Sequence, residues 1–254
     1  MAQTLTRTSF HSSKLIRVLA DLSVLDSAAP GAAFAEQVAQ WVDFKHAIGL
    51  SSVHGAQAAA ASPTPSDSGY ATLNDAFVKA RSGMERAIAN AAAPGGRSRN
   101  PLPKPAQDAT IDEARAYTPY RRYHQAQQRE WELSVSSLRA KVRDGVAQAA
   151  PQLAQLVALD AAFDEILYER EVRLLATLPT LLERRYHHLY KAHAHSLADR
   201  QQADQVDQWC KPGGWLTGFH NELQTVLLAE LDLRLQPAVG LLEALHNEPT
   251  QQHA

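Results

Sequence analysis

The sequence of 254 residues contains one cysteine, Cys210, so no disulfide can form within the chain and a reducing compartment is the simplest setting. It has no run close to the ~18 apolar residues of a transmembrane helix. Residues 1–14 lack the apolar core of a signal peptide. The net charge is only −2, which gives no overall attraction to nucleic acid or to membranes. These absences predict a cytoplasmic protein without membrane insertion.

Sequence motifs of the common enzyme classes are also missing. The phosphate-binding loop, the dinucleotide-binding glycine fingerprint, the nucleophile elbow and the HExxH zinc helix do not occur, and a single cysteine excludes paired CxxC. We therefore expect no catalytic residue, no cofactor and no metal site. An enzyme or metal-binding bundle without a known motif stays open as an alternative.

The most apolar long segment is 214–246, and its pattern predicts one central helix. Steps of three and four residues place one set of apolar side chains on a single helix face: Leu216, Phe219, Leu223, Leu227, Leu231, Leu235, Val239, Leu242 and Leu245. A second set lies off that face: Val226, Leu228, Leu233 and Leu241. A helix that is apolar on more than one side needs cover from several neighbours. Too few long helices are expected in the chain to supply it, so the segment also predicts a dimer.

Two details of this segment affect its predicted secondary structure. Residues 229–236 alternate apolar and polar side chains, which is typical of a strand, but they lack β-branched residues and are rich in helix-forming ones. Glu230 and Arg234 are four residues apart in the order that favours a pair on a helix surface. We therefore predict a helix, with a kink or a break at Pro237.

The chain before this segment also has the pattern of long helices. Thr110 and Glu113 form a capping box, and Thr118-Pro119 starts a helix that can run to about residue 149. Residues 151–199 predict one helix kinked at Pro179, or two nearly collinear helices. Residues 200–214 predict a polar loop. Together, residues 108–254 predict a long antiparallel bundle of three helices.

The N-terminal part predicts shorter elements. Residues 1–50 form a helical hairpin with helices near 12–25 and 31–48, whose second helix lacks the exposed polar side chains that read DNA bases. Residues 51–69 are a flexible linker of small and polar residues. A single helix follows within 70–92, starting at a capping box formed by Thr72 and Asp75. Residues 93–107 hold four prolines and form a linker, either a semi-rigid spacer or a docking peptide.

Charge is distributed unevenly along the chain. Residues 79–143 carry thirteen basic and six acidic side chains, a net charge of +7. Residues 196–254 carry three basic and eight acidic side chains, a net charge of −5. The simplest interpretation is that the two segments are neighbours in the bundle. The alternative is a nucleic-acid-associated protein that uses the basic segment, although nucleic acid is the less favoured partner.

Three weaker patterns could carry chemistry. Glu183 and His187 share a helix face with further histidines, but the spacing is one residue longer than the di-metal motif, and neighbouring arginines repel a cation. Cys210 lies in a glycine-rich loop without a nucleophile motif. Residues 115–131 are rich in tyrosine, tryptophan and arginine, which dominate binding hot spots. From this region and the CKPGGW loop we predict a possible interaction surface formed by Tyr117, Tyr120, Arg121, Arg122, Trp209 and Trp215, with bundle packing as the alternative.

Three stretches resemble a bacterial family of uncharacterised proteins that share a domain of unknown function. They are KLIRVLADL with AEQVAQWVDFKHAI, PYRRYHQAQQREWELSVSSLRAKVR, and WCKPGGWLTGFHNELQTVLLAELDLRLQPAVGLLEAL. PGGW followed by the leucine-rich helix is the most specific part. The resemblance implies no catalytic residues. It implies a partner in an envelope-associated protein complex. We expect an all-α, non-enzymatic scaffold or adaptor that acts through protein–protein contacts and self-associates.

Overall fold

The structure is a computed structural model that describes residues 14–22, 67–93, 98–106 and 108–247. These residues are mostly helical and contain no strand, which confirms the all-α prediction. No helix within these ranges is both long and apolar enough to cross a membrane. The elements in chain order are α1 (Lys14–Asp21), α4 (Asp67–Ala92), α5 (Ile111–Ala114), α6 (Thr118–Ala149), the 3₁₀ helix η2 (Pro151–Leu153), α7 (Ala154–Leu175), α8 (Leu178–Asp199), α9 (Val206–Trp209) and α10 (Trp215–Asn247).

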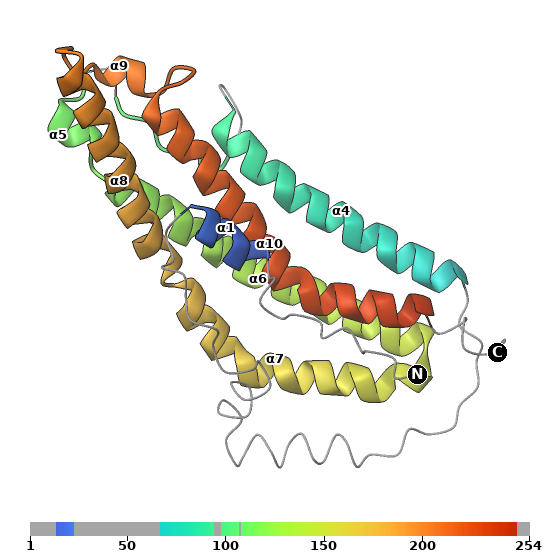
Figure 1. Cartoon of the computed structure of the whole chain (residues 1–254). Coiled ribbons are helices and arrows are strands. Elements are labelled where there is room, and N and C mark those ends of the chain that lie inside the picture. Colours follow the sequence, from blue (N-terminus) through green and yellow to red (C-terminus); the bar gives the residue numbers. More distant parts are fainter. Residues whose placement is uncertain (1–13, 23–66, 94–97, 107, 248–254) are drawn as a thin grey trace, which may run out of the picture.

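The long helices form an antiparallel bundle (Figure 1). Helix α6 runs along the bundle, α7 and α8 return along it, and α10 runs parallel to α6. Helix α4 lies antiparallel to α10, because the Tyr70 ring near the start of α4 is 4.7 Å from the His246 ring near the end of α10. The bundle thus contains α4 as well as the three long helices expected between residues 108 and 254.

Helix α10 is the centre of the bundle. It contacts α1, α4, α6, α7, α8 and α9. Both predicted apolar sets contribute buried side chains, and the two sets together bury Leu216, Phe219, Leu223, Val226, Leu227, Leu231, Leu235, Leu241, Leu242 and Leu245 to 4% exposure or less. The expectation that the chain has too few helices to cover α10 is therefore wrong, since α4 and α1 complete the cover. Incomplete cover of α10 within one chain therefore no longer supports the dimer prediction.

Pro237 lies inside α10, which continues from Trp215 to Asn247 without a break. Proline has no N–H to donate to the preceding turn and crowds it. Figure 1 shows α10 bending along its length. Of the predicted kink or break, the break is absent, and packing on both sides holds the helix together: Leu235 before the proline and Ala238 after it are 0% and 1% exposed.

The helical segment that returns along the bundle is divided into α7 and α8. The sequence predicted the position of this division only approximately. Helix α7 ends at Leu175 and α8 begins at Leu178, so the interruption lies before Pro179. Pro179 occupies the first turn of α8, a position that proline favours because its missing N–H has no helical partner there. The capping box of Thr110 and Glu113 is confirmed, as is the start of α6 at Thr118-Pro119.

Two boundaries were predicted wrongly. Helix α4 begins at Asp67, five residues before the expected start at Thr72. The loop expected over 200–214 contains the short helix α9, whose Trp209 is fully buried and fixes that turn in the core. Helix α1 (Lys14–Asp21) lies within the predicted 12–25 helix and buries Leu15 and Leu19, while residues 12–13 and 23–25 of that prediction lie outside the described residues. The predicted helix 31–48 and nearly all of the linker 51–69 lie outside the described residues.

The described part of the proline-rich segment, residues 98–106, is not helical, as predicted. It is nevertheless packed onto the bundle. Leu102 is 5% exposed, and its N–H donates to the carbonyl of Ala91 at 2.9 Å. The side chain of Asn100 donates to the carbonyl of Tyr123 and to the side chain of Gln127, both at 3.1 Å. This segment therefore connects the end of α4 to α6 through hydrogen bonds to both helices.

The glycines of the PGGW turn yield a prediction. Gly213 has a φ of +84°, and a Cβ on Gly214 would collide with the backbone carbonyl oxygen of Trp209. We expect Gly214→Ala to lower the free energy of unfolding by about 1–3 kcal/mol, because backbone must move to make room.

Gly218→Ala and Gly240→Ala are matched controls in α10, where no neighbouring element has an atom within 4 Å of the added carbon. Each should raise the free energy of unfolding by about 0.5–1 kcal/mol through helix propensity. Urea titrations followed by circular dichroism measure all three, and equal effects at the three sites would contradict the packing of this turn.

Candidate functional site

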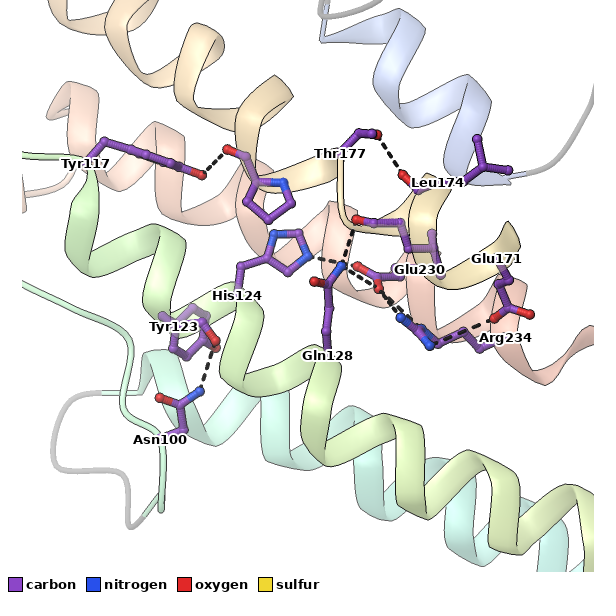
Figure 2. A network of polar contacts seen from close by, with 12 residues as sticks. Asn100, Tyr117, Tyr123, His124, Gln128, Glu171, Leu174, Thr177, Glu230 and Arg234 are labelled. Atoms are coloured by element: carbon purple, nitrogen blue, oxygen red, sulfur yellow. Dashed lines mark hydrogen bonds and ion pairs between the residues drawn. The ribbon is translucent and has the colours of Figure 1, made fainter. Parts of the chain in front are cut away.

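A cluster of charged and polar side chains lies inside the bundle between α6, α7 and α10 (Figure 2). Its centre is Glu230 on α10, which is 0% exposed although its neighbours Leu227 and Leu231 belong to the apolar core. His124 on α6 is also 0% exposed, and Arg234 on α10 is 7% exposed. Buried charges are rare unless paired, so this cluster is the most unusual chemical feature of the described chain.

The carboxylate of Glu230 accepts hydrogen bonds from two helices. His124 Nε2 on α6 lies 2.8 Å from Glu230 Oε2. Glu230 Oε1 accepts from Gln128 Nε2 on α6 at 3.0 Å and from Arg234 Nη2 on α10 at 2.9 Å. With its acceptor sites occupied by donors from both helices, this carboxylate fixes α6 and α10 against each other.

The same cluster reaches the interruption between α7 and α8. Gln128 Nε2 also donates to the carbonyl oxygen of Leu175, the last residue of α7, at 2.9 Å. Carbonyls at a helix end lack a partner within the helix, so this bond satisfies one of them. Arg234 Nη1 lies 3.8 Å from Glu171 Oε1 on α7. Three helices therefore meet through Gln128, Arg234 and Glu230.

Electrostatics keep Glu230 ionised. Burial raises the pKa of its carboxyl, but hydrogen bonds and charge from His124 and Arg234 outweigh burial and hold the pKa below its usual range. Burial raises the pKa of Glu171, with Arg234 opposing the change. Glu230 and Arg234 thus form a buried pair of opposite charges, with Glu171 as a weaker outer partner.

A second ionic group joins α6 to α7. Arg139 Nη1 is 2.8 Å from Asp164 Oδ1, and Arg143 Nη2 is 2.7 Å from Asp164 Oδ2. Asp160 lies 3.9 Å from Arg139 Nη2 and 3.6 Å from Arg143 Nε. Burial raises the pKa of Asp160, and both arginines lower it. These four side chains lie on the sides of α6 and α7 that face each other.

The three most buried charged side chains of the cluster lie away from the two best-formed hollows of the described surface. Among the hollows at the surface of the described chain, one of about 360 Å³ lies between α4 and α6 and one of about 490 Å³ lies beside residues 103–109. His124, Glu230 and Arg234 line neither of them. The arrangement holds α6, α7 and α10 in register through hydrogen bonds and ion pairs.

The family model for a protein of unknown function, DUF3348, matches residues 1–247. The chain belongs to this family. No curated protein and no solved structure matches it. Membership agrees with the predicted family of unknown function, and it assigns no activity to the charged cluster.

The predicted interaction surface is only partly at the surface. Tyr117, Tyr120 and Trp209 are 3%, 2% and 0% exposed, as the alternative of bundle packing predicts. The Tyr117 hydroxyl donates to the carbonyl of Pro179 at 2.8 Å, and Trp209 Nε1 donates to Asp204 Oδ1 at 2.7 Å. These aromatic rings instead join α6, α8 and α9 to α10.

The other members of that set differ in exposure. Trp215 is half-buried and packs edge-on against the Tyr186 ring at 5.1 Å. Arg121 is half-buried and pairs with Glu183, whereas Arg122 is exposed. As contact residues for a partner, Arg121 and Arg122 stay a prediction.

The histidine-rich stretch of α8 does not gather a metal site within the described residues, where no group of three or more potential ligands was found. Glu183 pairs with Arg121 rather than with His187. His193 Nε2 lies 3.0 Å from Asp204 Oδ1, the carboxylate that also accepts from Trp209. In the structure, the contact of His193 with Asp204 holds α9 against α8.

Cys210 is exposed in the loop before α10. Partial burial raises the pKa of its thiol, and the charge of Lys104 opposes that change. A raised pKa leaves less thiolate at neutral pH, which is the opposite of the activation that a nucleophilic cysteine needs.

Basic residues of the 79–143 segment are partly neutralised within the bundle. Arg81 Nη2 pairs with Asp232 Oδ1 of α10 at 2.8 Å. This pair agrees with the prediction that the basic and acidic segments are neighbours in the bundle. Arg139 and Arg143 pair instead with α7, and Arg121 pairs with α8. The basic segment thus has acidic neighbours, but most of them come from residues 160–183.

Sequence reasoning missed the charged cluster. It placed Glu230 and Arg234 together correctly and assigned them to the helix surface, whereas both are buried. His124, Gln128 and Glu171 carried no signal. The available clue was Glu230 itself, a carboxylate between the apolar residues Leu227 and Leu231 in a helix predicted to be central.

Proposed function

We propose that this chain is a helical scaffold or adaptor that acts through protein–protein contacts, beginning with self-association. One observation carries the proposal. Helix α7 has an apolar face, here called the α7 apolar face, that does not belong to the core of the described bundle: Leu156, Leu159, Phe163, Leu167 and Leu174.

The spacing of these residues, at steps of three, four and seven, keeps them on one side of α7. Leu156 and Leu174 are 37% and 58% exposed, and the other three are half-buried. Asp160 and Asp164 on α7 point instead to the arginines of α6. Helix α7 therefore presents charge to its own bundle and leucine and phenylalanine away from the main core.

A second copy of the chain is the occupant we propose. An apolar stripe is complementary to itself, so two copies related by a two-fold axis can pair their α7 helices and cover both stripes at once. A continuous stripe of apolar side chains outside the core, exposed at both ends, marks a contact site more often than an isolated apolar residue does. The single leucine Leu133 on α6, which is 78% exposed, provides the contrast.

Replacing Leu159 and Phe163 together with glutamate tests this proposal. We expect the native chain to sediment as a dimer or larger species and the double variant to shift to monomer, because four buried carboxylates per interface are not tolerated. Leu133→Glu is the matched control and should leave the assembly unchanged. Circular dichroism of each variant shows that the helices are retained. A native chain that stays monomeric at all concentrations tested would contradict the proposal.

The family resemblance supports a finer proposal, in which the chain acts in the bacterial cytoplasm beside an envelope-associated complex. An all-α bundle whose charged cluster joins its own helices suits an adaptor of that kind. The nucleic-acid alternative is less well supported, because Arg81, Arg121, Arg139 and Arg143 of the basic segment are already paired with carboxylates.

A further inference from the structure

The side of α7 that faces the bundle has an unusual composition. Steps of three and four residues define this inner stripe, which is apolar at its ends and mostly acidic between them: Val157, Asp160, Asp164, Tyr168, Glu171 and Leu175. The positions that α10 fills with leucine are here filled by carboxylates.

Arginines from two helices face these carboxylates. Arg139 and Arg143 of α6 meet Asp160 and Asp164, and Arg234 of α10 meets Glu171. The side chains of Arg139 and Arg143 are 10% and 15% exposed, so the pairs are largely removed from water. Removing charged groups from water carries a penalty that their attraction often fails to offset.

Apolar burial adds little to the attachment of α7. Only Ile166 and Leu175 among its 22 residues are buried, whereas twelve apolar residues of α10 are buried. Both ends of α7 are interruptions in the helix. It follows the 3₁₀ turn Pro151–Leu153 and stops before the non-helical pair Ala176 and Thr177.

We propose that α7 is a hinged arm that opens from the bundle between residues 150 and 177 while α6, α8 and α10 stay packed. The closed arm rests on largely desolvated charge pairs rather than on an apolar core, so its attachment is weak. The remaining helices keep their own core, because Tyr186 and Leu182 of α8 are fully buried against the rest of the bundle. This inference concerns the inner side of α7 and does not depend on self-association through the α7 apolar face.

The two acidic groups with shifted pKa values support this view and give its pH dependence. Burial raises the pKa of Asp160, opposed by Arg139 and Arg143 and reinforced by Asp164. Burial also raises the pKa of Glu171, opposed by Arg234 and Arg139 and reinforced by Asp164 and Glu230. The closed arm therefore binds these protons more tightly than an open arm in water does. Closure is favoured at low pH and weakens as pH rises through the raised pKa values.

Hydrogen exchange read by mass spectrometry tests the hinge on the full chain. At neutral pH, we expect peptides of α7 to exchange by local opening, with protection far below that of α6 and α10. After correction for intrinsic exchange rates, protection of α7 relative to α10 should fall as pH rises from about 4 to 7.

Variants separate the ionic attachment from general stability. Replacing Arg139 and Arg143 with methionine and Asp160 and Asp164 with leucine should raise the protection of α7 at least about tenfold, since apolar replacements of buried ion pairs commonly stabilise. Glu171→Gln is a milder variant that should reduce the pH dependence. The control is the pair between α8 and α10, Arg185 with Glu222 at 2.6 Å, replaced by methionine and leucine, which should leave α7 unchanged.

Three results would overturn the hinge. The first is protection of α7 equal to that of α10 at neutral pH. The second is an α7 protection that does not change with pH. The third is a four-residue variant that folds, by circular dichroism, and yet exchanges in α7 as fast as the native chain.

Discussion

Replacing Glu230 with leucine is expected to lower the free energy of unfolding by about 3–5 kcal/mol, although leucine suits an apolar core. The reason is the charge left behind. Arg234 is 7% exposed and would keep its positive charge with only Glu171, 3.8 Å away, as a partner. Gln128 would lose one of its two acceptors. Urea unfolding of the native chain and the variant, followed by circular dichroism, measures the loss.

A double variant distinguishes loss of a charge pair from loss of a packed side chain. With Glu230→Leu and Arg234→Met together, no buried charge is orphaned, and we expect much of the lost stability to return. A double variant as unstable as the sum of the two single variants would contradict the pairing. The stability that Glu230 contributes also depends on pH. The pKa of Glu230 is lowered in the folded chain, so its stabilisation is complete above about 4.5 and is lost as pH falls through the folded value. The native chain and Glu230→Leu should therefore become more alike in acid.

Replacing Phe219 with alanine is expected to lower the free energy of unfolding by about 3–5 kcal/mol. Phe219 is 0% exposed and lies at the centre of the aromatic group that joins α6 and α8 to α10. Its ring meets those of Tyr120 and Tyr186 edge-on at 5.4 and 5.0 Å. Its removal leaves a cavity and ends these ring contacts.

Two controls accompany Phe219→Ala. Phe219→Leu keeps most of the volume and should lose clearly less stability, because the cavity is smaller. Leu133→Ala removes an apolar side chain that is 78% exposed and should change stability by no more than about 0.5 kcal/mol. Similar losses at positions 219 and 133 would mean that the aromatic group is not part of the core.

Much of the fold could be predicted from local patterns. The spacing of leucines identified α10, and the capping box and Thr118-Pro119 located α5 and the start of α6, because these signals act within a few residues. Local rules left the outcome open, or missed it, where distant packing decides. Helix α10 runs through Pro237 because neighbouring helices hold both sides, and Trp209 forms α9 because its ring is buried between α8 and α10.

The candidate site could not be predicted in the same way. Glu230 and His124 are 106 residues apart, and Gln128 reaches Leu175 only because the returning segment of α7 and α8 is interrupted beside it. The inner stripe of α7 shows the same limit. Its acidic residues occupy core-facing positions only once α6 places Arg139 and Arg143 opposite them. Periodicity finds a helix face, but it does not tell which face meets an arginine.

A photo-crosslinking amino acid at position 163 tests the central claim, that the chain acts through contacts of the α7 apolar face. Equal amounts of ¹⁵N-labelled and unlabelled protein, mixed before irradiation, allow mass spectrometry to distinguish links between copies from links within one copy. The same residue at position 133 is the control. The account predicts mixed-isotope crosslinks from position 163 to α7 of a second copy, and none from position 133. Only links within one copy from position 163 would contradict it.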